Sequence, residues 1–167
     1  RGSVGQALGV VFRSPTALLL TVGFSAIVFV NNAYVVWAPV FVQEKFKLSL
    51  TQAGGYAMFY HHLAALLGVL FGGWLSDRMA VASPVFRPRM MGTAMLLGAP
   101  VIFMMGRADS LLAVCVTMAG FGLFRGLYEA NTHAALFQVI APANRASAVG
   151  VMTMLAFLVG SLSPWLL

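Results

Sequence analysis

Charged side chains are scarce in this sequence, and cysteine is almost absent. Only 8% of the 167 residues are charged, whereas a soluble globular domain carries about 25%. Hydrophobic residues make up 60% of the chain, and the mean hydropathy is +0.91. Four acidic residues cannot cover a water-facing surface, so the composition excludes a soluble enzyme and indicates a chain that lies in a lipid bilayer. With Cys115 as the one cysteine, no intrachain disulfide, thiolate metal site or redox pair can form.

Residues for covalent chemistry are also missing. The sequence shows no nucleophile beside a base and no phosphate-binding glycine loop before a strand. The adjacent His61 and His62 cannot chelate one metal as residues at i and i+4 do, and no nearby carboxylate completes a site. We therefore expect no enzyme activity, no cofactor and no metal. The net charge of +6 would suggest nucleic acid in a soluble protein, but here basic residues flank apolar runs and are interpreted as topology signals.

Apolar runs of membrane-spanning length divide the chain. They cover five ranges, 16–42, 53–75, 90–106, 111–140 and 146–167. Because the chain starts without methionine and stops within an apolar run, we expect a piece of a longer polypeptide. The runs are too many and too long for a cleaved signal sequence. They predict a multi-pass protein of the cytoplasmic membrane, surrounded by lipid.

Basic residues predict the orientation of these spans. If the first span starts in the cytoplasm, six Lys and Arg lie inside and three outside, as the positive-inside rule prefers. The inside set is Arg1, Arg13, Arg78, Arg87, Arg89 and Arg145, and the outside set is Lys45, Lys47 and Arg107. The reverse orientation is the alternative, and it would require the basic loop 76–89 to be translocated.

Small residues recur at helical spacing within the spans. The pairs are Gly68/Gly72, Gly122/Gly126 and Ala146/Gly150. Such faces let helix backbones approach closely in a membrane, although glycine is also simply common in membrane helices.

Charged residues at mid-depth of the fourth span are the most informative. Arg125 lies about 21 Å along this run, and Glu129 and His133 follow on the same face at steps of four. An Arg at the bilayer centre costs at least about 3 kcal/mol, so it must face a watery cavity, a partner charge or both. Arg before Glu is the less favourable order within a helix, which favours partners elsewhere. For Arg125 the alternative is a charge pair that only locks two helices together. For Glu129 it is a permanent salt bridge with Arg125, and for His133 it is a purely structural place at the edge of a polar vestibule.

Other polar residues lie at comparable depth on the first and second spans. Adjacent His61 and His62 point about 100° apart, so one of them can face a given cavity. Amides at mid-depth hydrogen-bond either a polar ligand or another helix. A cavity lined by the first, second and fourth spans is the simplest geometry. Its predicted substrate-binding residues are Asn31, Asn32, Tyr34, His61, Arg125 and Tyr128.

The stretch Gly73-Trp-Leu-Ser-Asp77-Arg78, which leads into a basic loop, resembles the signature loop of the major facilitator superfamily. That signature continues with a Gly-Arg-Arg/Lys run, but here the next arginines, Arg87 and Arg89, come later and after Ser83 and Pro84. Weaker matches are Arg13-Ser-Pro, Trp37-Ala-Pro39, residues 48–54 and residues 142–150. The likeness covers nearly the whole chain, although only the 73–78 motif is specific.

This resemblance implies an all-α membrane fold of two six-helix halves, with residues 1–167 as five helices of one half. The degenerate loop favours the carboxyl half, spans seven to eleven, whereas Arg125-Gly-Leu-Tyr-Glu129-Ala resembles a motif of the amino half. The resemblance further implies a monomeric secondary transporter that works by alternating access, with the other half of the same polypeptide as the partner of these five helices. By this analogy Gly73, Asp77 and Arg78 form a gating loop, and Asp77 caps a neighbouring helix.

The expected function is uptake of a small polar organic solute, an organic anion or sugar acid, by proton symport. Arg125 would hold the carboxylate, and Glu129 would leave Arg125 on substrate binding and take the coupling proton. The alternatives are proton-driven efflux of amphiphilic or cationic compounds, for which an apolar cavity would suffice, and a non-transporting membrane module.

Overall fold

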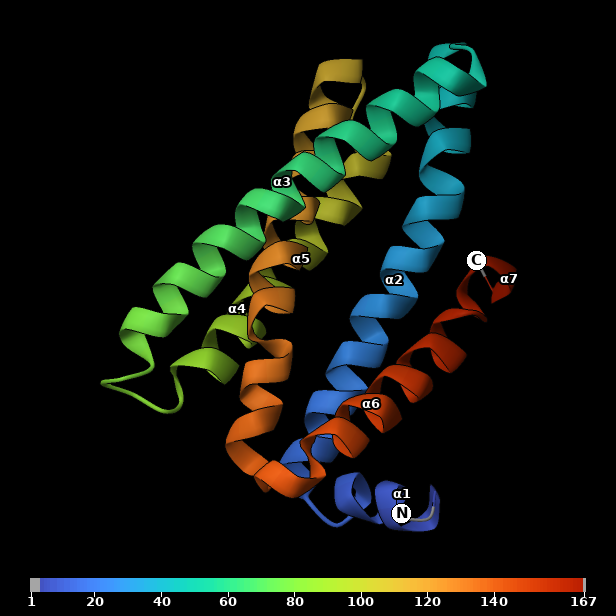
Figure 1. The fold of residues 1–167 in the computed structure, drawn as a ribbon. Helices are drawn as coiled ribbons and strands as arrows, with labels where there is room; N and C mark the ends of the chain where they lie inside the picture. The colour runs from blue at the N-terminus through green and yellow to red at the C-terminus, as the bar shows by residue number, and fades with distance from the viewer. Residues whose placement is uncertain (1–3, 167) are drawn as a thin grey trace. The chain divides into compact units, whose positions relative to one another are not determined.

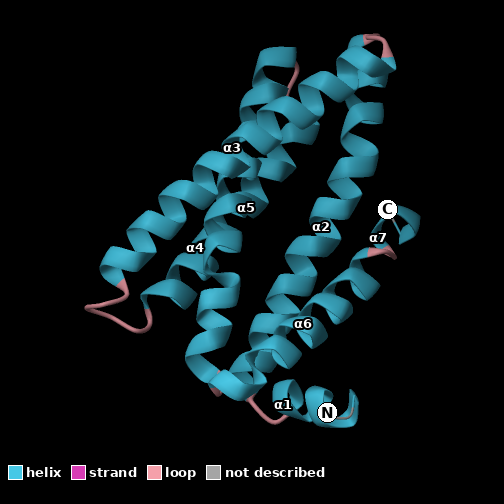
Figure 2. Cartoon of the chain, viewed as in Figure 1, coloured by secondary structure: helices cyan, strands magenta, loops and turns pink. Residues whose placement is uncertain are grey.

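The computed structural model describes residues 4–166, and their side chains from residue 8 onward. The elements in chain order are α1 (Val4–Phe12), α2 (Pro15–Phe46), α3 (Leu50–Met79), α4 (Phe86–Arg107), α5 (Leu111–Val139), a short 3-10 helix (Pro142–Asn144), α6 (Arg145–Gly160) and α7 (Ser163–Leu166) (Figure 1). Between residues 4 and 166 the connections are turns and loops and no strand occurs (Figure 2). The predicted all-α fold class is therefore confirmed.

Five of these segments are long and apolar enough to cross a membrane: α2, α3, α4, α5 and the segment Pro142–Leu166. The first four are single helices, and α2, with 32 residues, is the longest. At 1.5 Å per residue α2 extends about 48 Å, more than the hydrocarbon core requires. The predicted fifth run differs, because α6 ends at Gly160 and the short helix α7 follows only at Ser163.

Serine side chains explain where α2 and α3 begin. Ser49 Oγ accepts a hydrogen bond from Gln52 N (3.3 Å), and Gln52 Oε1 accepts one from Ser49 N (3.3 Å), which makes a capping box for α3. Ser14 Oγ accepts from Ala17 N (3.3 Å) directly before Pro15, a favourable first residue of a helix. At the other end of α2, Lys47 has a φ of 54°, a left-handed conformation that ordinarily belongs to glycine.

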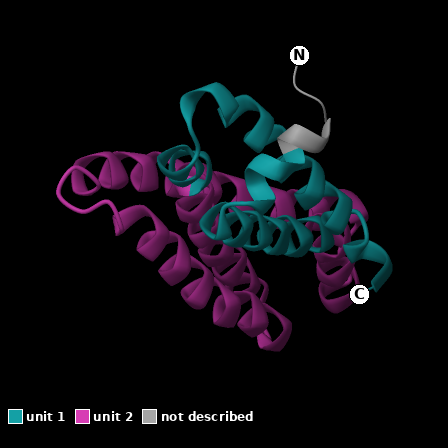
Figure 3. Cartoon of the chain, turned by 90° about the horizontal axis from the view of Figure 1, so that it is seen from below, with its two compact units in different colours: residues 1–34, 132–167 teal, residues 35–131 magenta. Residues whose placement is uncertain are grey.

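Two compact units share these helices (Figure 3). One contains Arg1–Tyr34 and Thr132–Leu167, and the other contains Val35–Asn131. The boundary falls within the continuous helices α2 and α5, so each of them contributes to both units.

In unit Val35–Asn131, α3 and α5 are in backbone contact. The buried stripe of α3 consists of small residues and one histidine, namely Ala53, Ala57, His61, Ala65, Gly68, Gly72 and Ser76. A Cβ atom added to Gly126 would lie 2.9 Å from Val69 N and closer still to Ala65 O. One added to Gly122 would overlap the His61 carbonyl in the same way. The predicted small-residue faces at 68/72 and 122/126 therefore pack against one another.

In unit Arg1–Tyr34 with Thr132–Leu167, α1 packs against α6, and α6 lies along α2. A Cβ atom on Gly160 would lie 2.8 Å from Val28 Cγ1 and 2.9 Å from Asn32 Nδ2, so this glycine makes room for both side chains. The third predicted pair differs from the other two. Ala146 and Gly150 are exposed, and a Cβ atom on Gly150 would meet no described atom within 4 Å.

Candidate functional site

Arg125 is the centre of a polar cluster in the middle of α5. Its Nη2 donates to Glu129 Oε1 at 2.6 Å, and its Nη1 lies 3.3 Å from Nε2 of His61 on α3. The side chains of Arg125 and Glu129 are 16% and 31% exposed, so both are largely shielded from solvent. The guanidinium Nε is buried and has no hydrogen-bond partner in the described part of the chain. Arg125 thus joins two helices and one carboxylate, and its buried Nε–H has no acceptor among the described residues.

The contact with Arg125 fixes the hydrogen position on His61. A guanidinium can only donate, so Nε2 of His61 must accept and the ring proton of the neutral tautomer lies on Nδ1. The His61 ring is fully buried and stacks on Phe121, with ring centroids 5.4 Å apart and planes at 26°. His62 is exposed instead, and its Nδ1 lies 2.9 Å from Met58 O within the same helix. Of the two adjacent histidines, His61 is therefore the one that faces Arg125.

The close approach of α3 and α5 is what places His61 beside Arg125. Gly122 and Gly126 flank Arg125 on α5, and they touch the backbone at His61 and at Ala65. Larger residues at these positions would separate the helices and move the imidazole away from the guanidinium. The small residues of the sequence thus build the charged cluster.

The other predicted binding residues are divided between the two compact units. Tyr128 is buried, with 3% of its surface exposed, in the same unit as Arg125. Tyr34, Asn31 and Asn32 belong to the other unit, where Tyr34 is 4% exposed and Asn32 lies against Gly160. Asn31 Oδ1 is buried and has no hydrogen-bond partner among the described residues.

His133, which the sequence places two turns beyond Arg125 on α5, makes an aromatic contact. Its ring meets Phe24 of α2 edge to face, with centroids 6.2 Å apart and planes at 60°. This packing ties α5 to α2 inside unit Arg1–Tyr34 with Thr132–Leu167. His133 itself remains exposed.

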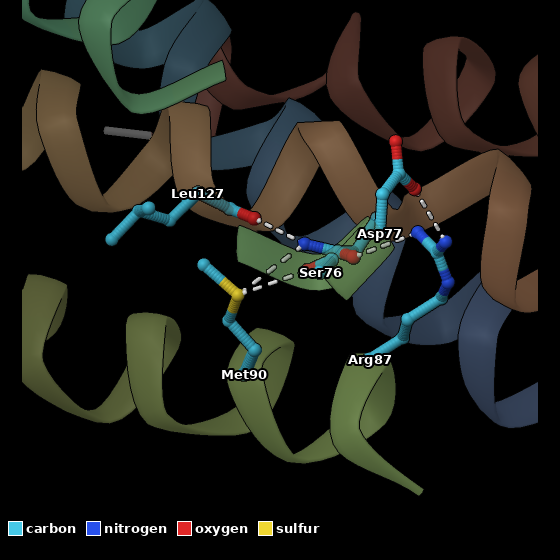
Figure 4. Close-up of polar contacts among 6 residues, drawn as sticks. Ser76, Asp77, Arg87, Met90 and Leu127 are labelled. Atoms are coloured by element: carbon cyan, nitrogen blue, oxygen red, sulfur yellow. Dashed lines mark hydrogen bonds and ion pairs between the residues drawn. The ribbon is translucent and has the colours of Figure 1, made fainter. Parts of the chain in front are cut away.

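The end of α3 forms a second polar cluster with α4 and α5 (Figure 4). Arg87 Nη2 donates to Asp77 Oδ1 at 2.7 Å, and Arg87 Nη1 donates to Asn131 Oδ1 at 3.3 Å. Asn131 Nδ2 donates in turn to Leu127 O at 3.0 Å. Ser76 and Asn131 also contact the Met90 sulfur, at 3.2 and 3.6 Å. Arg87 is thus the link between three helices.

Asp77 pairs its carboxylate with the Arg87 side chain. The cap residue of α4, Val85, has no side-chain capping bond, so the helix cap by Asp77 stays a prediction. The Arg87 side chain is the more buried partner, with 14% exposure against 75% for Asp77. Arg78 stacks its guanidinium over Trp74 at 4.6 Å, and Gly73 has no described atom within 4 Å of its Cβ position.

Sequence reasoning missed Asn131, which is fully buried and accepts from Arg87. A signal was present, because Asn131 is a polar residue within the fourth span, as Asn31 and Asn32 are within the first. Its contact with α4 could not be derived from spacing, since it joins residues 44 positions apart.

Comparison with known proteins agrees with this architecture. A family model described as Major Facilitator Superfamily matches residues 1–164. No solved structure matches the chain. The match makes no distinction between the two halves of the fold, so the assignment to the carboxyl half stays a prediction. Almost the full length of the sequence is covered, and the chain belongs to the major facilitator superfamily of membrane transporters.

Proposed function

We propose that this protein carries a small organic anion, such as a sugar acid, across the cytoplasmic membrane together with a proton. The observation behind the proposal is the environment of Arg125, which pairs with Glu129 and His61 and retains a buried Nε donor without a partner in the described residues. A buried donor of a charged group is costly to leave unpaired. A carboxylate of the solute would supply the missing acceptor.

Charge balance links the solute to the proton. Arg125 and Glu129 together carry no net charge, so an added carboxylate leaves the cluster with one excess negative charge. In a low-dielectric site this excess is unfavourable, and a proton on Glu129 removes it. His61 stays neutral while it accepts from Arg125, and it positions the guanidinium without contributing charge. Binding of acid and binding of proton thus favour each other.

Alternating access would open this cluster first to one side of the membrane and then to the other. The Asp77–Arg87–Asn131 contacts lie at the end of α3, and they join α3, α4 and α5. Breakage and formation of such contacts would accompany the change of state. Gly73, Asp77 and Arg78 remain the proposed gating loop.

Transport by reconstituted protein tests the proposal. Liposomes with an internal pH dye report proton movement while sugar acids, neutral sugars or lipophilic cations are added outside. Arg125→Lys loses the guanidinium geometry and should weaken acid uptake about 10- to 100-fold, the range of one charge-assisted hydrogen bond. Glu129→Gln should abolish acid-driven proton movement.

Exposed residues of the same types supply the controls. Arg89→Lys and Glu44→Gln change residues that are exposed, so both should leave uptake unchanged. Unaltered pH-driven uptake in Arg125→Lys or in Glu129→Gln would refute the proposal. A response to lipophilic cations alone would indicate efflux instead.

A further inference from the structure

A single hydrogen bond joins Arg125 to Glu129, although a guanidinium and a carboxylate can make two. Arg125 Nη2 donates to Glu129 Oε1 at 2.6 Å, and the second carboxylate oxygen, Oε2, makes no hydrogen bond with a described residue. A guanidinium offers a carboxylate two matching edges, Nη1 with Nη2 and Nε with Nη2, and a pair that uses both donors of an edge is the stronger one. This pair therefore has less than its full strength.

His61 of α3 occupies a donor that a second contact would need. Its Nε2 lies 3.3 Å from Arg125 Nη1, so the Nη1–Nη2 edge is divided between an imidazole and a carboxylate. The remaining donor, Nε, is buried and has no acceptor among the described residues. The guanidinium is thus held at both ends of one edge by two helices, and Glu129 holds only one of these ends.

Packing against α5 keeps the His61 ring in this position. His61 is fully buried, its ring stacks on Phe121 with centroids 5.4 Å apart, and Gly122 touches its backbone. Phe121 and Gly122 lie within the same turn of α5 that leads to Arg125. The helix that carries the guanidinium therefore also fixes the imidazole, and the ring cannot follow Arg125 if the guanidinium turns toward Glu129.

We propose that His61 is a positioning residue that keeps the Arg125–Glu129 pair to one hydrogen bond, so that Glu129 can exchange Arg125 for a proton. This inference rests on the proposed function for the role of Glu129. Without the imidazole, Nη1 would turn to Oε2 and complete a two-bond pair. The proton would then compete less well for Glu129, and the solute carboxylate less well for Arg125. His61 thus acts through Arg125 and touches neither the proton nor the solute.

The surroundings of Glu129 contain few other ionisable groups. Within the described residues, Arg125 is its one ion-pair partner. The neighbouring titratable side chains are His61 and His62 on α3, with ring centroids 5.0 Å apart, and Tyr128 and His133 on α5. Because an opposite charge and its hydrogen bonds favour the ionised form of a carboxyl group, the number of bonds from Arg125 governs how readily Glu129 accepts a proton.

The pH profile of uptake by the reconstituted, full-length transporter tests this role. His61→Leu removes the acceptor. The pH of half-maximal glucuronate uptake should then fall by about one unit, and KM for glucuronate should rise about tenfold, as expected for a pair about tenfold stronger. His61→Gln should restore the original profile, because glutamine Oε1 accepts hydrogen bonds and lies as many bonds from Cα as the imidazole Nε2.

His62→Leu is the matched control for loss of a histidine. His62 is adjacent to His61 but exposed, and its Nδ1 contacts Met58 O within α3. This variant should keep both the pH profile and KM. His61→Val supplies a second apolar variant if His61→Leu does not fold, as judged by thermal unfolding of the purified protein.

Infrared spectroscopy follows Glu129 directly and requires neither solute nor transport. A protonated carboxyl group gives a C=O stretching band, and the band that Glu129→Gln lacks belongs to Glu129. At a pH where Glu129 of the unmodified protein is partly protonated, His61→Leu should show a weaker band. His61→Gln and His62→Leu should show a band of the original intensity.

Three results would overturn this inference. A Glu129 band of equal or greater intensity in His61→Leu would mean that the imidazole does not weaken the pair. An equal loss in His61→Gln would mean that the acceptor at the Nε2 position is not the cause. A Glu129 that stays ionised at every pH would contradict the inference together with the proposed proton site. The first two results leave acid-driven proton movement intact in the unmodified protein, so failure of the proposed function would be seen separately.

Discussion

Replacement of Gly126 by alanine should separate α3 from α5 and disable the Arg125 cluster. The added Cβ would lie 2.9 Å from Val69 N and closer still to Ala65 O, whereas Cβ atoms do not approach such neighbours within 3.0 Å. Both neighbours are backbone atoms, so no side chain can rotate aside. The helices must move apart, and the 3.3 Å contact between Arg125 Nη1 and His61 Nε2 then lengthens beyond hydrogen-bond range.

The change in the free energy of unfolding is the sum of two destabilising terms and one stabilising term. Overpacking of a close helix contact costs about 1–3 kcal/mol, and loss of a hydrogen bond to a charged group costs about 1.5–3 kcal/mol. Alanine returns up to about 1 kcal/mol through its helix propensity. The net expectation for Gly126→Ala is a destabilisation of about 1.5–6 kcal/mol together with strongly reduced uptake.

Thermal unfolding of the purified protein in detergent measures this effect. Gly92→Ala is the control, because Gly92 is exposed on α4 and a Cβ atom there meets nothing within 4 Å. It should be neutral or stabilising by up to about 1 kcal/mol. If Gly126→Ala unfolds at the same temperature as Gly92→Ala, the helices are not in backbone contact and the reasoning is refuted.

Four further substitutions test other parts of the structure by the same unfolding assay. Asn131→Leu removes a fully buried acceptor of Arg87 and should lower the free energy of unfolding by about 1–3 kcal/mol. Asp77→Asn changes a side chain that is 75% exposed and should lower it by at most about 1 kcal/mol. A larger loss for Asp77→Asn than for Asn131→Leu would contradict the assigned contacts. Lys47→Gly should stabilise by about 1 kcal/mol because φ is 54° there, and a loss of stability would contradict the left-handed helix end. Ser49→Ala removes the cap of α3 and should cost about 1 kcal/mol, so an unchanged unfolding temperature would argue against the capping box.

Composition and apolar run length were sufficient to predict the five long helical segments, because membrane spans carry their signal in local sequence, whereas α1 was not predicted. The apolar runs, the small-residue faces and the serine before α3 are all local features. The break between α6 and α7 was not predicted, because no charge interrupts residues 146–167, although Gly160, Ser161 and Pro164 are local turn signals.

Contacts between helices were harder to predict, because they depend on how each helix is rotated. Spacing alone left His61 and His62 equivalent, and the backbone contact of Gly122 with α3 is what selects His61 for Arg125. The order of Arg125 and Glu129 favoured partners on other helices, yet the structure shows both an intrahelical pair and a histidine from α3.

Exchange of labelled sugar acid through Glu129→Gln liposomes tests the central claim most directly. If Arg125 binds the acid and Glu129 carries the proton, this variant should exchange labelled for unlabelled acid across the membrane with no pH gradient, at a rate similar to that of the unmodified protein. It should fail to accumulate acid when a pH gradient is imposed. Accumulation driven by pH in Glu129→Gln would contradict the account, because the proton would then travel by a group other than the partner of Arg125.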